Sequence, residues 1–220
     1  MTRCIVLDVD DTLYLERDYV RSGFRAVGVW ASARLGVEDL HERAWRLFEA
    51  GSRGHIFDDC LRQVGVDASP ATVAEMVSVY RQHRPDITLT PDALRFLKAL
   101  SGKTALAIVT DGPLESQTAK VEALELKRWA DEIVLTAAHG PRFHKPSCRA
   151  FEMVSARIGV TGARCAYIAD NPSKDFAGPK SLGWTTIRIK RDGGLHSSLR
   201  SDRNVDVEIH SFDDLPWRNS

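Results

Sequence analysis

The chain has 220 residues, and its 30 Lys and Arg residues balance its 30 Asp and Glu residues, so the formal net charge is zero. A balanced charge gives no electrostatic footprint for nucleic acid or for an anionic membrane surface, and we expect neither as a partner. No apolar stretch approaches the length of a membrane span. The length and the hydrophobic fraction of 43% suit a globular protein with a large core.

The N-terminal residues and the cysteines predict a cytoplasmic protein. Residues 1–3 lead directly into a short apolar run that ends in acids, which is unlike a secretion signal. The 4 cysteines are scattered and include no C-x-x-C pair. We therefore expect reduced thiols and no zinc site. Composition does not decide between a monomer and a homodimer.

The first apolar run is followed at once by three carboxylates. Residues 3–7 are apolar and β-branched without alternation, which indicates a buried strand of a parallel sheet. Asp8, Asp10 and Asp11 then crowd like charges at the strand end, although repulsion and desolvation oppose this. A bound cation would relieve the crowding. We therefore expect Asp8 and Asp10 to hold a metal and do chemistry, and Asp11 to be a solvated or capping acid.

Residues 14–87 are expected to be nearly all helical. Apolar residues recur at three- and four-residue intervals. The expected helices cover residues 18–35, 37–50, 56–64 and 70–84. The last of these follows Ser69, a fair N-cap residue, and has Pro70 at its first helical position.

From residue 88 onward, strands alternate with helices. The expected strands cover residues 104–109, 132–135, 165–169, 185–189 and, at the sheet edge, 205–209. Residues 190–204 are rich in Gly, Ser and Arg and predict a flexible loop. The alternation predicts an α/β fold with a doubly wound parallel sheet. We expect a Rossmann-like core from residues 1–13 and 88–220, with residues 14–87 inserted after the first strand as a helical cap.

Polar residues follow the last apolar residue of three predicted strands: Asp8, Thr110 and Asp170. Because ligands of doubly wound sheets bind at the carboxyl ends of the strands, we expect these residues to meet at one edge. Asp8 and Asp10 point the same way in extended chain, so one can be a nucleophile and the other a general acid and base. Taken alone, an acidic turn explains the pair as well. Thr12 either fixes Asp10 by a hydrogen bond or caps the following segment.

Four further residues have a functional and a simpler explanation. Thr110, at the start of a helix, suits a phosphate oxygen but is equally suited to an N-cap. Lys145 would neutralise a transferring phosphoryl group, or is a surface charge. Asp170 is placed to reach a metal or to form an Asx-turn. Asp175 could hold Lys145 or the waters of a metal, or could favour a helix N-terminus.

In this order and at these strand ends, the groups resemble the haloacid dehalogenase superfamily of phosphohydrolases. The matching motifs are residues 7–13, 108–112, 144–146 and 167–175, and the pattern over 117–134 is similar as well. The helices inserted between the first two motifs look like the type-one cap of that family. The resemblance implies a phosphoric monoester hydrolase that acts on a small-molecule phosphate ester.

The resemblance also implies roles for individual residues. Asp8 would attack phosphorus and form an aspartyl-phosphate, and Asp10 would protonate the leaving group and then activate water. Mg²⁺ would be held by Asp8, by the backbone carbonyl of Asp10 and by Asp170. Oxygen ligands suit Mg²⁺ better than a soft metal. The phosphoryl oxygens would be bound by Thr110, Asp111 and Lys145.

Two residues depart from the usual pattern of that family. Ala169 stands where the family usually has glycine, which would displace the Asp170 loop if positive φ is needed there. Asp11 replaces another common glycine.

Asp10 argues against a true dehalogenase. Sugar phosphates are favoured because residues 170–176 and 179–184 are similar to sugar-phosphate and surface-polysaccharide enzymes. A nucleoside monophosphate phosphatase, a phosphomutase and a non-catalytic binding protein are the alternatives.

Overall fold

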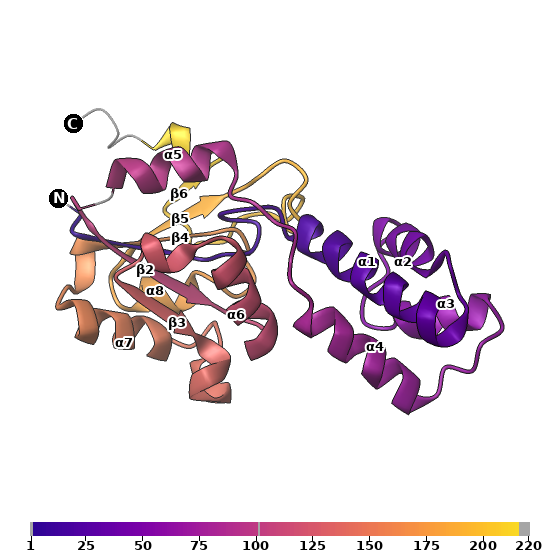
Figure 1. Cartoon of the computed structure of the whole chain (residues 1–220). Helices are drawn as coiled ribbons and strands as arrows, with labels where there is room; N and C mark the ends of the chain where they lie inside the picture. Colours follow the sequence, from indigo (N-terminus) through magenta and orange to yellow (C-terminus); the bar gives the residue numbers. More distant parts are fainter. Residues whose placement is uncertain (1, 101, 216–220) are drawn as a thin grey trace. The chain divides into compact units, whose positions relative to one another are not determined.

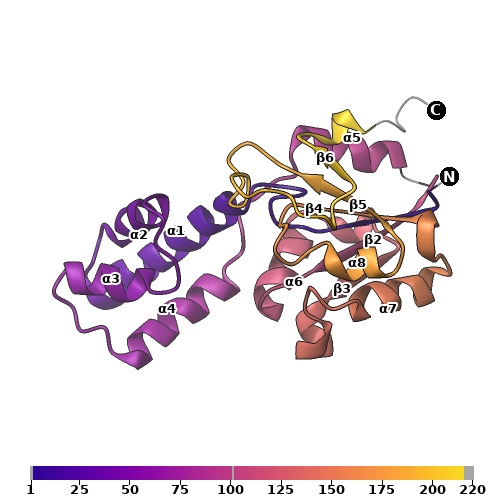
Figure 2. The same cartoon turned by 180° about the vertical axis from the view of Figure 1, so that it is seen from behind.

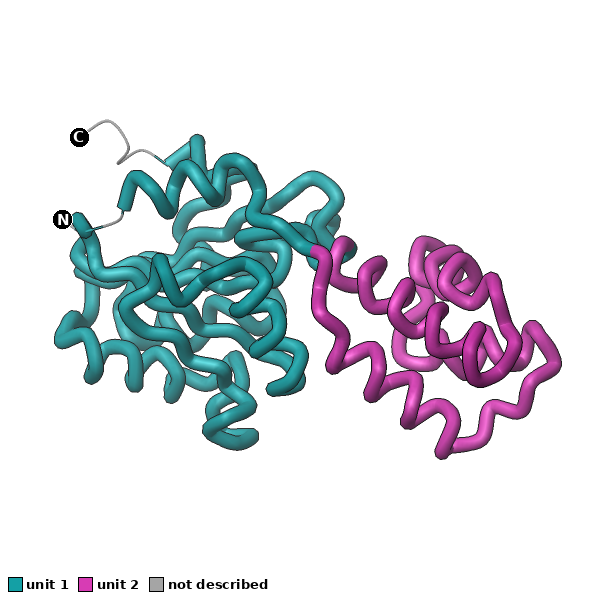
Figure 3. Tube along the Cα trace, viewed as in Figure 1, with its two compact units in different colours: residues 1–17, 87–220 teal, residues 18–86 magenta. Residues whose placement is uncertain are grey.

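The computed structural model describes residues 2–100 and 102–215. The chain divides into two compact units, one formed by Met1–Arg17 with Ile87–Ser220 and the other by Asp18–Asp86 (Figure 3). The boundaries expected from the sequence, after residues 13 and 87, differ from these by a few residues. The first boundary lies later because helix α1 begins at Glu16, within the larger unit.

A parallel sheet forms the centre of the larger unit (Figure 1). Its strands are β1 (Cys4–Leu7), β2 (Ala105–Thr110), β3 (Glu132–Leu135), β4 (Cys165–Ala169), β5 (Thr185–Ile189) and β6 (Val207–Ile209). The spatial order is β3-β2-β1-β4-β5-β6, and each neighbouring pair is parallel. This is the order of a doubly wound sheet, so the predicted fold class is confirmed.

Helices connect the strands of this sheet. They are α5 (Pro91–Leu100), α6 (Leu114–Ala123), α7 (Arg149–Ile158) and α8 (Ala177–Ser181). The chain moves from β1 outward to β3 and then crosses to β4 and β5 on the other side. Because parallel crossovers are right-handed, this reversal places the later helices on the opposite face. Figures 1 and 2 show α5 and α7 on opposite sides of the sheet.

The strand register aligns the chemically important strand ends. Leu7, the last residue of β1, pairs with Ile108 of β2 and with Ile168 of β4. On one face, β-strand side chains pack under α7, where the Phe151 ring lies 4.8 Å from that of Tyr167 in an edge-on contact. Burying such aromatic and aliphatic side chains stabilises the layered core and fixes the level at which the strands end.

The smaller unit is a helical bundle. Its helices are α1 (Glu16–Leu35), α2 (Leu40–Glu49), α3 (Ile56–Gln63) and α4 (Pro70–Gln82), and residues 18–86 contain no strand. Phe24 of α1 lies at its centre, with ring centroids 6.2 Å from Phe48, 5.9 Å from Phe57 and 5.8 Å from Tyr80. Ser69 caps α4 by accepting a hydrogen bond from the Thr72 N–H, as its position in the sequence predicts.

Two expectations drawn from composition can be compared with the described residues. None of their helices combines the length and the apolar character needed to cross a bilayer. The cysteines Cys4, Cys60, Cys148 and Cys165 are thiols and form no disulfide.

Residues 190–204 form a loop, as predicted, and hydrogen bonds to other parts of the chain hold this loop in place. The buried guanidinium of Arg188 donates to the carbonyl oxygens of His196 and Leu199 at 2.8 and 2.9 Å. The Leu195 N–H donates to a carboxylate oxygen of Asp11 at 2.7 Å. Loop composition reveals turns, but it does not reveal partners supplied by distant residues.

A buried ion pair ties this loop and the C-terminal segment to α5. Both carboxylate oxygens of Asp92 lie 3.1 Å from Nη1 of Arg191, and one of them accepts the Phe212 N–H at 2.9 Å. The Arg191 Nε–H donates to the carbonyl of Thr12 at 2.8 Å. The Phe212 ring stacks on Phe96 of α5, with 4.4 Å between centroids. Asp92 therefore joins three separate segments of the chain.

Replacing Asp92 by Asn is expected to lower the free energy of unfolding by about 3–5 kcal/mol, because it leaves a buried guanidinium uncompensated. Arg95 and Asp213 form an exposed ion pair between the same helix and turn. Asp213→Asn is therefore a matched control that should cost less than about 1 kcal/mol. Urea unfolding at pH 7 measures both losses, and equal small losses would contradict the role of Asp92.

The pH dependence of the Asp92→Asn effect follows from the pKa of Asp92. Burial alone would raise this pKa, but hydrogen bonds from Thr90 and Phe212 and the charge of Arg191 hold it well below its usual range. Such a carboxyl stabilises the fold above its unfolded pKa of about 3.9, and the contribution is lost as pH falls toward the folded value. The difference between wild type and variant should be constant above about pH 5 and shrink below about pH 4.

Candidate active site

Three neighbouring strands end at the same edge of the sheet, and each delivers a polar residue there. Asp8 directly follows β1, and its N–H donates to the Ile168 carbonyl of β4 at 3.0 Å. Thr110 is the last residue of β2, and Asp170 directly follows β4. All three are buried. The sequence-based expectation that these residues share one edge is therefore met by the register of the central strands.

A buried lysine reaches this edge from the loop that precedes α7. Lys145 Nζ donates to Asp175 Oδ1 and to the Tyr167 hydroxyl at 2.8 Å each, and it lies 3.0 Å from Asp8 Oδ1. The side chains of Lys145 and Asp175 are both 0% exposed. Burial would lower the pKa of Lys145, but the charges of Asp175 and Asp8 hold it well above its usual range. The ammonium is therefore charged.

Asp8, Asp170 and Asp175 form a cluster whose carboxylate oxygens lie within 4.8 Å of one another. Burial raises the pKa of Asp8 to about 6, although the charge of Lys145 opposes this. Burial and the charges of Asp175 and Asp8 raise the pKa of Asp170 well above its usual range. One ammonium does not balance three carboxylates, so the cluster has an excess of negative charge that a divalent cation would offset.

The hydrogen bonds of the cluster distinguish its members. Asp175 uses one carboxylate oxygen for Lys145 and the other for the Asn171 N–H, at 2.9 Å. Asp8 Oδ1 lies 3.0 Å from Lys145 Nζ but makes no aligned hydrogen bond. Asp175 thus holds the lysine, whereas the Asp8 oxygen and the nearby carboxylate of Asp170 can act as ligands of a hard cation. Buried carboxylate oxygens of this kind fit Mg²⁺.

Asp10 lies in a different environment from Asp8. Lys120 Nζ lies 2.7 and 2.9 Å from its two carboxylate oxygens, and Gln117 Nε2 donates to it at 3.0 Å. The Tyr14 hydroxyl also donates to Asp10. Burial would raise the pKa of Asp10, but the charge and hydrogen bond of Lys120, with these other donors, lower it. The Asp10 carboxylate therefore has its own set of donors, which differs from the partners of Asp8.

Asp111, which the resemblance places among the phosphate contacts, uses both carboxylate oxygens on a neighbouring loop. One carboxylate oxygen accepts from the Thr136 hydroxyl at 2.5 Å, and the other accepts the Lys145 N–H at 3.0 Å. The side chain thus holds the segment that carries Lys145. Its predicted contact with phosphate remains untested.

Three smaller expectations can also be compared with the structure. The Thr12 hydroxyl is buried and has no hydrogen-bond partner among the described residues, so the expected bond to Asp10 or to the loop is not formed. Asp11 is capping rather than solvated, because it is 1% exposed and accepts the Glu16 N–H at the start of α1. It adopts φ of 48°, as suits a position where glycine is common. Ala169 does not have positive φ, so its methyl group introduces no strain there.

The contact of Asp175 with Lys145 was among the expectations from the sequence, but the residues that contact Asp10, and Tyr167 beside Lys145, were not. Gln117 and Lys120 are three residues apart and 2% and 3% exposed, and Tyr14 and Tyr167 are fully buried. The spacing of Gln117 and Lys120 was readable as a polar pair on one helix face. No signal in the sequence named Asp10 as its partner.

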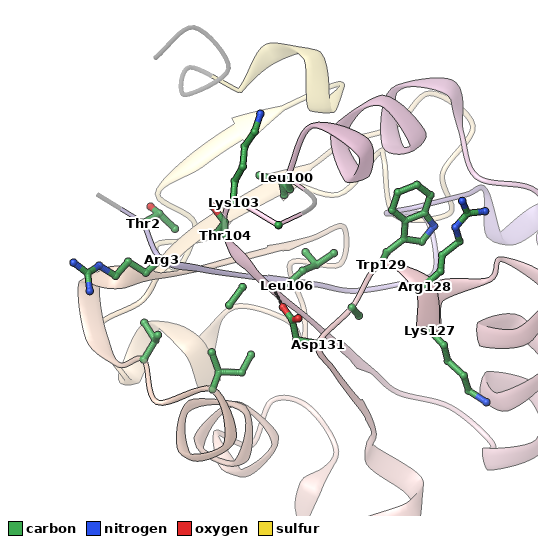
Figure 4. A pocket seen from close by; sticks show the side chains of 15 residues that line it. Thr2, Arg3, Leu100, Lys103, Thr104, Leu106, Lys127, Arg128, Trp129 and Asp131 are labelled. Carbon is green, nitrogen blue, oxygen red and sulfur yellow. Dashed lines mark hydrogen bonds between the residues drawn. The ribbon is translucent and has the colours of Figure 1, made fainter.

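A second hollow lies at the opposite, amino-terminal edge of the sheet (Figure 4). It has a volume of about 790 Å³ and is lined in part by Arg3, Lys103 and Lys127. The charged ends of these three side chains point in different directions in Figure 4, so they do not converge on a common anion. The chemically organised groups are at the carboxyl edge.

Comparison with known proteins assigns this arrangement to a known group. The sequence model of a hydrolase family, the haloacid dehalogenase-like hydrolases, matches residues 2–183. The glyceraldehyde 3-phosphate phosphatase of Methanopyrus kandleri is 29% identical over 224 residues, covering 95% of this chain and 93% of that protein. The enzyme of that name from Methanocaldococcus jannaschii is 28% identical, covering 98% and 96%. The phosphoserine phosphatase of Thermus thermophilus is 27% identical over 63% of this chain and 55% of its own length.

Solved structures share the fold. The HAD-hydrolase YfnB of Bacillus subtilis, described as bound to magnesium, superposes with a TM-score of 0.69 at 20% identity, covering 96% of each chain. The 2-haloacid dehalogenase of Pseudomonas syringae superposes with a TM-score of 0.67 at 23% identity, covering 98% of this chain and 97% of that one. At these identities the likeness concerns the fold, and it agrees with the predicted α/β core.

Replacing Asp111 by Ala is expected to lower the free energy of unfolding by about 1–3 kcal/mol, because the Lys145 N–H and the Thr136 hydroxyl lose their acceptor. The 136–145 segment should then be cleaved faster by trypsin after Arg142. Asp202→Ala, at an exposed turn, is the control and should change neither urea unfolding nor cleavage. Unchanged cleavage of Asp111→Ala would show that its carboxylate does not hold the segment.

Proposed function

The chain belongs to the haloacid dehalogenase-like hydrolases, and on that premise we propose that it is a Mg²⁺-dependent phosphatase that hydrolyses a small phosphomonoester through an aspartyl-phosphate at Asp8. A sugar phosphate is the favoured substrate. The family assignment confirms the resemblance noted in the sequence. The phosphatases among the relatives confirm the expected enzyme class, a phosphoric monoester hydrolase.

The observation that carries the proposal is the buried Asp8–Lys145–Asp170–Asp175 cluster. It places the Asp8 carboxylate, whose Oδ1 makes no aligned hydrogen bond, beside a charged ammonium and a second buried carboxylate. A carboxylate attacks a phosphate dianion only when the charge of both is offset. Asp8 and Asp170 would hold Mg²⁺, with the Asp10 carbonyl as the further ligand expected from the family. The bound metal would neutralise phosphoryl charge as a Lewis acid.

The chemistry of the chain's own residues divides between the two carboxylates near β1. An Asp8 oxygen attacks phosphorus and the bond to the ester oxygen breaks, while Asp10, which enters this step protonated, gives that oxygen its proton. Asp10 then takes a proton from water, which attacks the aspartyl-phosphate and regenerates Asp8 with release of phosphate. Lys145 and Thr110 orient the phosphoryl oxygens, and Asp175 keeps Lys145 extended toward Asp8.

The relatives support sugar phosphates as substrates. The relatives from Methanopyrus kandleri and Methanocaldococcus jannaschii, which align along nearly the whole chain, are both named for the phosphate ester of a three-carbon sugar. The relative named for phosphoserine aligns over a shorter part of the chain. A substrate panel should therefore contain triose and longer sugar phosphates, phosphoserine and nucleoside monophosphates.

The purified protein is expected to release phosphate from 4-nitrophenyl phosphate with Mg²⁺ and to lose this activity in EDTA. On the substrate panel, sugar phosphates should give the highest kcat/KM. Asp8→Asn removes the nucleophile while keeping its shape, so turnover should fall by at least about 10³-fold. Asp202→Asn should match the wild type. Turnover in EDTA, or an active Asp8→Asn enzyme, would rule out the proposed mechanism.

Metal binding can be measured without turnover. Mg²⁺ at about 100 times its Kd should stabilise the fold by about 2.7 kcal/mol, which raises the Tm by roughly 5–10 °C. Asp170→Asn should lose this rise. In EDTA the same variant should melt no lower than the wild type, because the substitution relieves repulsion among the carboxylates. An unaltered Mg²⁺ response in Asp170→Asn would exclude this carboxylate as a ligand.

A further inference from the structure

Helix α6 contributes two buried polar side chains to Asp10. The Lys120 ammonium lies within 2.9 Å of both Asp10 oxygens, and the Gln117 amide nitrogen donates to Oδ2. The side chain of Lys120 is 4% exposed and that of Asp10 is 16% exposed. An aspartate side chain can rotate, but donors to both of its oxygens hold the carboxylate in one orientation.

Packing of α6 does not by itself require a glutamine and a lysine at these two positions. Gln117 and Lys120 lie three positions apart, one turn along α6, so they share a face. Burying an ammonium or an amide is unfavourable unless its hydrogen bonds are made, and an apolar residue packs such a face at less cost. The two side chains therefore serve the carboxylate that they contact.

Gln117 also links Asp10 to the end of β2. Its Oε1 accepts from the Thr110 hydroxyl at 3.1 Å, and its Nε2 donates to the Asp111 carbonyl at 3.0 Å. These contacts fix which end of the amide faces Asp10. Gly112 makes room for it, because a Cβ there would lie 2.5 Å from Gln117 Nε2, and its φ of 146° disfavours other residues.

We propose that Lys120 and Gln117 are positioning residues that hold the Asp10 carboxylate in place to serve the leaving-group oxygen. The proposal rests on the phosphatase function proposed above and deepens it. Lys120 fixes the plane of the carboxylate by contacting both oxygens. Gln117 sets its place relative to Thr110, so the proton-transfer group and the expected phosphate contact keep a fixed separation.

Leaving-group dependence separates this role from a purely structural one. The value of kcat/KM reports the steps through cleavage of the ester bond. 4-Nitrophenyl phosphate needs little acid assistance because its leaving group is stable as an anion, whereas benzyl phosphate, of similar size, expels a basic alkoxide. Loss of a well-placed general acid costs about 10²–10⁴-fold where assistance is needed.

In the Mg²⁺-loaded enzyme, Lys120→Met is expected to lower kcat/KM for benzyl phosphate by about 10²-fold and that for 4-nitrophenyl phosphate by less than about 5-fold. Asp10→Asn should also lower kcat/KM more for benzyl phosphate than for 4-nitrophenyl phosphate, and by a larger factor than Lys120→Met. Lys127→Met, at an exposed position after α6, is the control and should leave both values unchanged. Equal losses on the two substrates, or no loss on either, would overturn the positioning role.

Gln117→Leu provides a second variant if Lys120→Met does not fold. It should show the same asymmetry at about 10-fold on benzyl phosphate, because Lys120 and Tyr14 still donate to Asp10. Lys120→Arg keeps the charge and should restore part of the loss. A wild type that hydrolyses neither ester with Mg²⁺ would overturn the phosphatase function itself, whereas an active wild type with symmetric losses would overturn only the roles of Lys120 and Gln117.

Discussion

The contact of one buried ammonium with two carboxylates organises the larger unit. Lys145 lies between Asp8 and Asp175, and none of these groups could be buried alone without a cost of several kcal/mol. Each is supplied by a different segment: the end of β1, the loop before α7 and the turn after β4. The ion pairs therefore hold those segments to one another. The Asp170 carboxylate lies beside Asp8 in the same cluster.

The parallel sheet brings these segments together. Neighbouring strands β2, β1 and β4 end at one level because Leu7 pairs with both Ile108 and Ile168. Apolar packing on both faces fixes that level, so polar residues placed just after the strands are brought together without a dedicated scaffold. Loops then complete the site. Asp111 holds the Lys145 backbone, and Asp11 and Asp92 hold the segment after β5.

These physical relations explain what the sequence could and could not predict. The positions of the strands and of the polar residues that follow them were predictable, because buried strands leave continuous apolar runs and the residues after them share an edge. The partner of each charged side chain was not predictable. Nothing local to Asp111 indicates that it accepts the Lys145 N–H, and nothing local to residues 190–204 indicates that Arg188 and Asp11 fix them. Whether the helical residues 18–86 act as a cap remains a prediction.

The contrast between Asp8 and Asp10 brings these points together. The two acids are two residues apart, yet burial raises the pKa of Asp8 to about 6, whereas Lys120 and its neighbouring donors lower the pKa of Asp10. The two side chains therefore have different surroundings, although they are two residues apart in the chain. Asp8 is buried beside Lys145 and its Oδ1 makes no aligned hydrogen bond, which suits a group that must bond to an electrophile. Asp10 is held by several donors, which suits a group whose position governs proton transfer.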